Sequence, residues 1–200
     1  MRRKKNHKLK SKENRILLIV ENSEADFFNQ YFKNHLKDNY NIIIDCEPSG
    51  SANKCEIANG NRMTKRIIEA LERERYRAVF LMIDLKTKCF TSENTHTCLV
   101  ELKNEYLPKY KIDKELKNKF YFFVVCNEIE SWFLTIDKDT NSVHKDHKKE
   151  LMKFLKVNSE PQIVQKMIKE LKSGTYKLDI SKNNSLEHFI QKLQEYSVLK

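Results

Sequence analysis

The feature that most constrains this chain is the segment RILLIVENSEADFF at residues 15–28, in which five apolar residues lead directly into a glutamate. The uninterrupted run from Ile16 to Val20 predicts a central parallel strand that is covered on both faces. Glu21 then lies at the carboxyl end of that strand, which is the edge where open α/β sheets bind their ligands. The alternative is that Glu21 is a solvated turn residue or an acid that favours the start of a helix.

Further strands and helices alternate with this first strand. Ser23 is predicted to cap a helix over residues 24–37, in which aromatic residues recur at three- and four-residue intervals. Strands are predicted over residues 40–47, 77–84 and 120–126. The alternation predicts an α/β fold with a mainly parallel four-stranded sheet that is flanked by helices.

Two more acids are predicted to share the rim of the sheet with Glu21. The third strand, RAVFLMID, ends in Asp84 and repeats the arrangement of the first strand, so the two acids lie close together if the strands are neighbours. Glu130 follows the fourth strand on a helix whose Ile129 and Trp132 share one face, and it can point across the strand ends. Alternatively, Glu130 only complements the dipole of that helix.

The chain divides into three parts. Residues 1–14 carry seven Lys or Arg against one Glu, a charge of +6 within the net +10, and predict a disordered arm that seeks phosphate. A solubilising tail is the alternative. Residues 15–137 form the α/β core. Residues 138–200 form a helical extension of the same domain, with helices over 150–155, 161–171 and 186–196 and with His144 and His147 exposed to solvent.

Several classes of protein are disfavoured by composition. No window of 18 apolar residues exists, and the basic N-terminus lacks the apolar stretch of a secretory signal, so we expect a cytoplasmic protein without a membrane span. Five cysteines without a CxxC spacing predict reduced thiols. Cys89, His96 and Cys98 lie close in sequence, but a fourth zinc ligand is not evident.

The motifs resemble those of Toprim domains and of RloB-like proteins over nearly the whole chain. The strand that leads into Glu21, with Asp26 and two phenylalanines after it, resembles the first Toprim motif, and the strand that ends in Asp84 resembles the second. The segment EIESWFLTID at residues 128–137 resembles a signature of RloB-like proteins. The basic arm, a late Tyr-Lys pair at residues 176–177 and the closing pattern of Ser185, Leu186, Phe189 and Leu193 also suit that group.

This resemblance implies a metal-dependent nuclease, an effector in conflicts between bacteria and phages. Mg²⁺ or Mn²⁺ would be held by Glu21, Asp84 and Glu130, with Glu21 acting as acid or base. These three residues and Lys86 are the candidate catalytic residues, and the candidate nucleic-acid contacts are Arg2, Arg3, Lys4, Lys5 and Lys177. An ATPase partner and a homo-oligomer stay open, as does the choice between DNA and RNA.

Two departures from the Toprim pattern support a second hypothesis. Asn22 replaces a glycine, and asparagine tolerates the same backbone angles better than most residues. Lys86 replaces the second acid of an Asp-x-Asp pair, and a cation there weakens divalent binding, although it could contact phosphate directly. The second hypothesis is therefore a catalytically weakened Toprim fold that binds nucleic acid or protein. A sugar or nucleotide enzyme is a third option, but no glycine-rich phosphate loop supports it.

Overall fold

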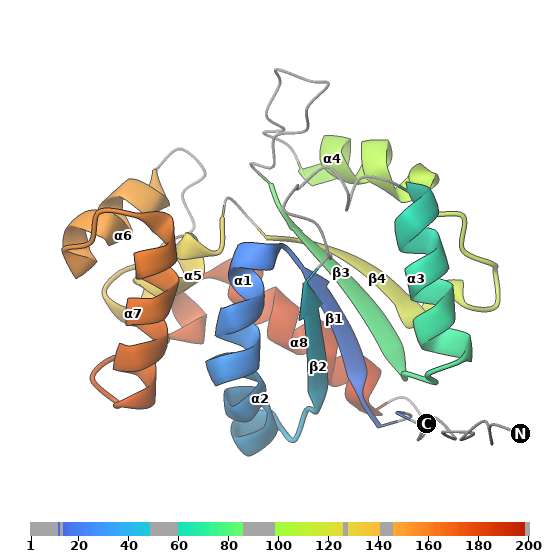
Figure 1. The fold of residues 1–200 in the computed structure, drawn as a ribbon, viewed down its shortest axis with the longest axis horizontal. Helices are drawn as coiled ribbons and strands as arrows, with labels where there is room; N and C mark the ends of the chain where they lie inside the picture. Colours follow the sequence, from blue (N-terminus) through green and yellow to red (C-terminus); the bar gives the residue numbers. More distant parts are fainter. Residues whose placement is uncertain are drawn as a thin grey trace, which may run out of the picture.

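A parallel sheet with the strand order β2-β1-β3-β4 forms the centre of the structure (Figure 1). The structure, a computed structural model, describes residues 12, 14–48, 60–85, 99–125, 128–140 and 146–198. The strands are β1 (Ile16–Val20), β2 (Ile44–Pro48), β3 (Ala78–Asp84) and β4 (Phe120–Val125). All three pairings between neighbouring strands are parallel. The predicted α/β class, with a four-stranded parallel sheet flanked by helices, is confirmed.

The helices follow the strands in alternation and then continue without strands. The first helical stretch is α1 (Asn22–Phe27), which continues as the π-helical η1 (Phe28–Phe32) and as α2 (Lys33–Tyr40). The core also holds α3 (Gly60–Glu72), α4 (Leu99–Tyr106) and α5 (Glu130–Phe133), and the C-terminal part holds α6 (His147–Leu155), α7 (Glu160–Lys172) and α8 (Asn184–Val198). Short 3₁₀ turns are η3 (Leu107–Lys109), η4 (Lys117–Lys119), η5 (Leu134–Ile136) and η6 (Ile180–Lys182).

Both faces of the sheet are covered, which explains why β1 is apolar at every position. Ile16, Leu18 and Val20 belong to a core that includes side chains of α1, α2 and the C-terminal helices. Leu17 and Ile19 point to the opposite face and belong to a second core beneath α3. Successive strand residues face opposite sides of a sheet, so a strand covered twice has no polar position. In Figure 1, α3 lies on one side of the sheet and α1, α2 and α8 on the other, with α6 and α7 beyond α1.

The helix after β1 begins earlier than the predicted residue 24. Glu21 is extended, with φ −62° and ψ 150°, and α1 starts at Asn22 immediately after it. The chain therefore passes from strand to helix within one residue. This short connection holds Glu21 at the strand end. Glu21 is only 4% exposed there, which excludes the alternative that it is a solvated turn residue.

The prediction that His147 is exposed is wrong, because His147 is fully buried in the first turn of α6. The charged segment around it looked like a loop, yet α6 packs against α5 and α7 and encloses this ring. Several other predicted residues lie outside the described residues, namely Arg2, Arg3, Lys4, Lys5, Lys86, Cys89, His96, Cys98 and His144. Among the described helices, none combines the length and apolarity needed to cross a membrane.

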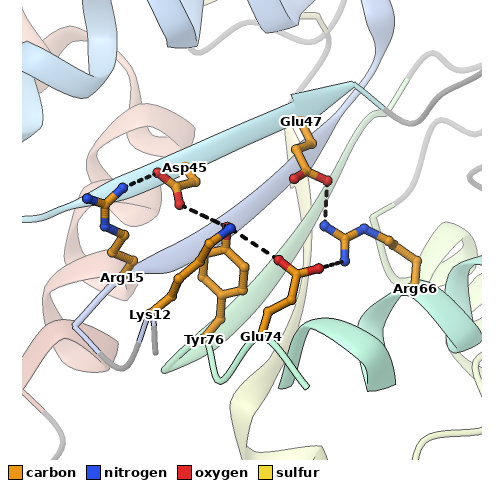
Figure 2. A network of polar contacts seen from close by, with 7 residues as sticks. All are labelled: Lys12, Arg15, Asp45, Glu47, Arg66, Glu74 and Tyr76. Atoms are coloured by element: carbon orange, nitrogen blue, oxygen red, sulfur yellow. Dashed lines mark hydrogen bonds and ion pairs between the residues drawn. The ribbon is translucent and has the colours of Figure 1, made fainter. Parts of the chain in front are cut away.

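A network of charged side chains fastens the edge strand β2 to α3 and to the residues that precede β1 (Figure 2). Asp45 and Glu47 pair in register with Leu17 and Ile19 and so face the α3 side of the sheet. Positions 45 and 47 are polar because β2 is the outermost strand and these two residues are only partly buried. The network consists of Lys12, Arg15, Asp45, Glu47, Arg66, Glu74 and Tyr76.

Glu74 lies at the centre of this network. Its carboxylate accepts hydrogen bonds from Arg66 Nη1 at 2.6 Å and from Lys12 Nζ at 3.1 Å, and Lys12 also contacts the Tyr76 hydroxyl. Tyr76 donates to Asp45 at 2.8 Å, and Arg66 also reaches Glu47. Burial, together with the bond to Asp45, raises the pKa of Tyr76 to about 12, so this phenol keeps its proton and remains a donor.

We predict that Glu74→Gln makes stability less dependent on pH in the acid range. Burial alone would raise the pKa of Glu74, but hydrogen bonds from Lys12 and Arg66 outweigh it and lower the pKa below its ordinary 4.5. A lowered folded-state pKa contributes stability above the unfolded value and loses it as pH falls through the folded value. Urea unfolding should therefore show a deficit for the variant at pH 7 that shrinks on going to about pH 3.

The control for this measurement is Glu72→Gln, two residues earlier on the exposed surface of α3. It should follow the wild-type pH dependence. A Glu74→Gln protein that keeps the full wild-type slope between pH 5 and 3 would show that the network contributes no pH-dependent stability.

Candidate functional site

A cavity of about 200 Å³ lies at the carboxyl edge of the sheet. Among the described residues it is lined by Glu21, Glu24, Asp26, Asp84, Ile129, Glu130, Lys148, Pro161, Val164 and Gln165. The three acids expected to converge there, Glu21, Asp84 and Glu130, all line it. These described residues include five carboxylates, and Ile129, Pro161 and Val164 are the apolar members.

Strand pairing brings Glu21 and Asp84 to this cavity. β1 and β3 are neighbours, and their register pairs Ile19 with Leu81. The end of β1 and the end of β3 therefore reach the same edge of the sheet. Both residues are 4% exposed. A carboxylate that is covered to this extent needs polar partners or a counter-ion, because an isolated buried charge is costly.

The short helix α5 brings Glu130 to the cavity, and the packing of its aromatic residues sets the orientation of the helix. Trp132 and Phe133 are fully buried, and Phe133 meets Phe27 of α1 with ring centroids 4.8 Å apart. The ring of Trp132 lies 5.2 Å from that of Phe189 on α8. Because these aromatic rings fix the rotation of α5, Glu130 at its first position turns toward the strand ends.

Buried hydrogen bonds tie α5 to the C-terminal part of the chain. The side-chain amide of Asn183 donates to Ser131 Oγ at 3.3 Å and to Thr140 Oγ1 at 2.8 Å. Its carbonyl oxygen accepts from the backbone N–H of Leu186 at 2.9 Å, inside the first turn of α8. One asparagine thus links the residue beside Glu130 to the helix that supports Trp132.

The cavity is also lined by polar residues that were not predicted as site residues, namely Glu24, Asp26, Lys148 and Gln165. Glu24 and Asp26 lie on α1, and the Asp26 carboxylate accepts a hydrogen bond from Gln165 of α7 at 3.3 Å. Lys148 comes from α6, and its Nζ lies 3.8 Å from Glu130 Oε1. Glu24 and Asp26 follow the first strand closely in the sequence, and this proximity was a signal that they lie near the same rim. The charged segment around Lys148 gave none.

The donor set of the cavity suits a hard divalent cation. Carboxylate oxygens are what Mg²⁺ prefers, and Mg²⁺ commonly keeps several waters while only one or two carboxylates hold it. Within the described part of the chain, no three His, Cys, Asp or Glu side chains are grouped closely enough to hold a metal ion. The arrangement thus fits a cation held by one or two of these acids together with water, rather than by an all-protein cage.

Lys177 does not line the acidic cavity. It lies at a different cleft of about 590 Å³, with neighbours from α2, from η5 and from η6, including His35, Tyr40 and Lys182. Burial lowers the pKa of His35 and Lys177 lowers it further, whereas Asp38 raises it, so this imidazole is neutral near pH 7. The predicted nucleic-acid contact at Lys177 is therefore separate from the three acids.

No known protein family, no curated protein and no solved structure matches this chain.

We predict that Asn183→Ala destabilises the protein by about 1–3 kcal/mol, because it removes three buried hydrogen bonds and leaves their partners without this side chain. Chemical unfolding monitored through Trp132, the sole tryptophan, reports the change. Gln191→Ala, an exposed position on α8, is the control and should change stability by less than about 0.5 kcal/mol. Equal stability of the two variants would show that Asn183 does not support the site.

Proposed function

We propose that this protein is a Mg²⁺- or Mn²⁺-dependent phosphodiesterase of the Toprim type, a nuclease that acts on nucleic acid. One observation supports this proposal above all others. Glu21 comes directly after β1, Asp84 is the last residue of β3, and Glu130 follows β4. All three line a single cavity at the carboxyl edge of the sheet.

The cavity supplies the groups that such a reaction needs. One or two of Glu21, Asp84 and Glu130, together with water, would hold the divalent ion, which when bound stabilises the negative charge of a phosphoryl transition state. Glu21 would also take or give a proton, as the Toprim resemblance implies. The apolar side chains of Ile129, Pro161 and Val164 also line the cavity, and apolar surroundings strengthen electrostatic interactions.

The net charge of the chain supports a polyanionic substrate. At +10 it favours association with phosphate backbones through the release of counterions. The resemblance to RloB-like proteins extends the proposal to a cytoplasmic role in conflict between bacteria and phages, alone, as a homo-oligomer or beside an ATPase partner. Lys86 would contribute a phosphate contact, and Arg2, Arg3, Lys4 and Lys5 further contacts to the nucleic acid.

A second candidate is a Toprim fold that binds nucleic acid or protein without catalysis. The observation that favours it is the contact between Lys148 and Glu130, because a resident cation already neutralises part of the site. This candidate predicts binding of nucleic acid that survives Glu21→Gln, weakens with salt and weakens when residues 1–14 are deleted.

The deciding experiment compares wild type with Glu21→Gln. Full-length protein is incubated with plasmid, single-stranded DNA and tRNA, each with Mg²⁺, with Mn²⁺ or with EDTA. We expect cation-dependent cleavage of at least one substrate by wild type, reduced by about 10²–10⁴-fold in the variant because a group that transfers protons is lost.

Asp38→Asn is the matched control, since Asp38 is an exposed acid on α2 that does not line the cavity. It should cleave like wild type. If EDTA changes nothing, or if Glu21→Gln and wild type cleave equally, the nuclease proposal fails and the binding candidate remains.

A further inference from the structure

We infer that Lys148 is a built-in competitor of the divalent cation at Glu130, and that once displaced it binds a phosphate oxygen of the substrate. This inference rests on the proposed function and assigns a role to a residue outside the three strand-end acids. It makes the C-terminal part of the chain a component of the site, not merely a cover for the core.

The contact has the geometry of an exchangeable pair. Lys148 Nζ lies 3.8 Å from Glu130 Oε1, whereas a charge-assisted hydrogen bond between these groups measures about 2.7–2.9 Å. The side chains are 25% and 10% exposed, so both charges are partly shielded from water. The ammonium group is therefore attracted to this carboxylate oxygen at a distance longer than a direct hydrogen bond.

Lys148 lies in the first turn of α6, where a positive charge is unfavourable unless nearby acids, here those of the cavity, compensate for it. It is the second residue of α6, and the first turn of a helix favours negative rather than positive charge. The helix already has a cap of the favoured type, because the Asp146 carboxylate accepts a hydrogen bond from the backbone N–H of Lys149 at 3.0 Å. A lysine at this place opposes the helix dipole, and the acids of the cavity compensate for it.

Charge balance explains how a metal ion and Lys148 would exchange. Five carboxylates and one lysine line the cavity among the described residues. Without a divalent ion, Lys148 offsets part of the repulsion between these acids. A divalent ion brings more charge to the same oxygens, which releases the ammonium group, and a compact ammonium with three donors suits a phosphate oxygen.

The test uses full-length Lys148→Met in two titrations. Calorimetry with MnCl₂ in the absence of nucleic acid should show affinity for Mn²⁺ raised roughly threefold, because the competing cation is gone. Binding of a single-stranded oligonucleotide with Mn²⁺ present should instead weaken, and the slope of log K against log salt should decrease by about 0.7, the contribution of one phosphate contact on a single strand.

Two variants serve as controls. Lys149→Met removes the next lysine, whose side chain is 86% exposed and pairs with Asp146, and should leave both titrations unchanged. Lys148→Arg keeps the charge and should restore the wild-type salt slope. Circular dichroism and the unfolding midpoint verify that each variant is folded.

The outcomes separate this inference from the proposed function. If wild type binds Mn²⁺ but Lys148→Met binds it equally or more weakly, the inference is wrong while the proposed function stands. If Mn²⁺ affinity rises and the salt slope stays at the wild-type value, the phosphate contact is wrong, and the inference fails. If neither protein binds Mn²⁺, both the inference and the proposed function fail.

Discussion

The parallel pairing of β1, β3 and β4 is the constraint on which the rest of the structure depends. Parallel strands in register end at the same edge, so residues far apart in sequence meet wherever each strand is followed by an acid. The register that pairs Ile19 with Leu81 and Asp84 with Val125 fixes this edge. The pairing is stable because apolar side chains fill both faces of the sheet. The core thus determines the geometry of the rim, although no core residue needs to take part in chemistry.

The C-terminal helices turn this rim into a cavity. α7 packs against α1 and contributes Pro161, Val164 and Gln165, while α6 packs against α5 and contributes Lys148. The rotation of α5 is set by Trp132 and Phe133 within the aromatic core, and this directs Glu130 toward the strand ends. A set of acids at a strand edge would otherwise be open to water, where electrostatic interactions are weak. The low exposure of Glu21 and Asp84, 4% each, makes the same charges more effective.

The sequence predicted the elements whose signal is local. The apolar runs before Glu21 and Asp84 identified two strands and their ends, and the spacing of Ile129 and Trp132 identified a buried helix face next to Glu130. Long-range packing left no comparable signal. His147 was expected in solvent because its neighbours are charged, and it is buried only because α6 docks on α5 and α7. Lys148 was missed for the same reason. Lys177 lies at another cleft, because the segment after α7 lies beside residues of α2 and η5 there.

The most direct test of the central claim, that the acids at this edge of the sheet provide a site for one divalent cation, is a crystal structure of the full-length protein grown with MnCl₂. The account predicts an anomalous difference peak inside the cavity, within coordination distance of at least one of Glu21, Asp84 and Glu130 and absent from crystals of Glu21→Gln. A well-ordered cavity without such a peak, or a manganese ion bound only elsewhere on the protein, would contradict it.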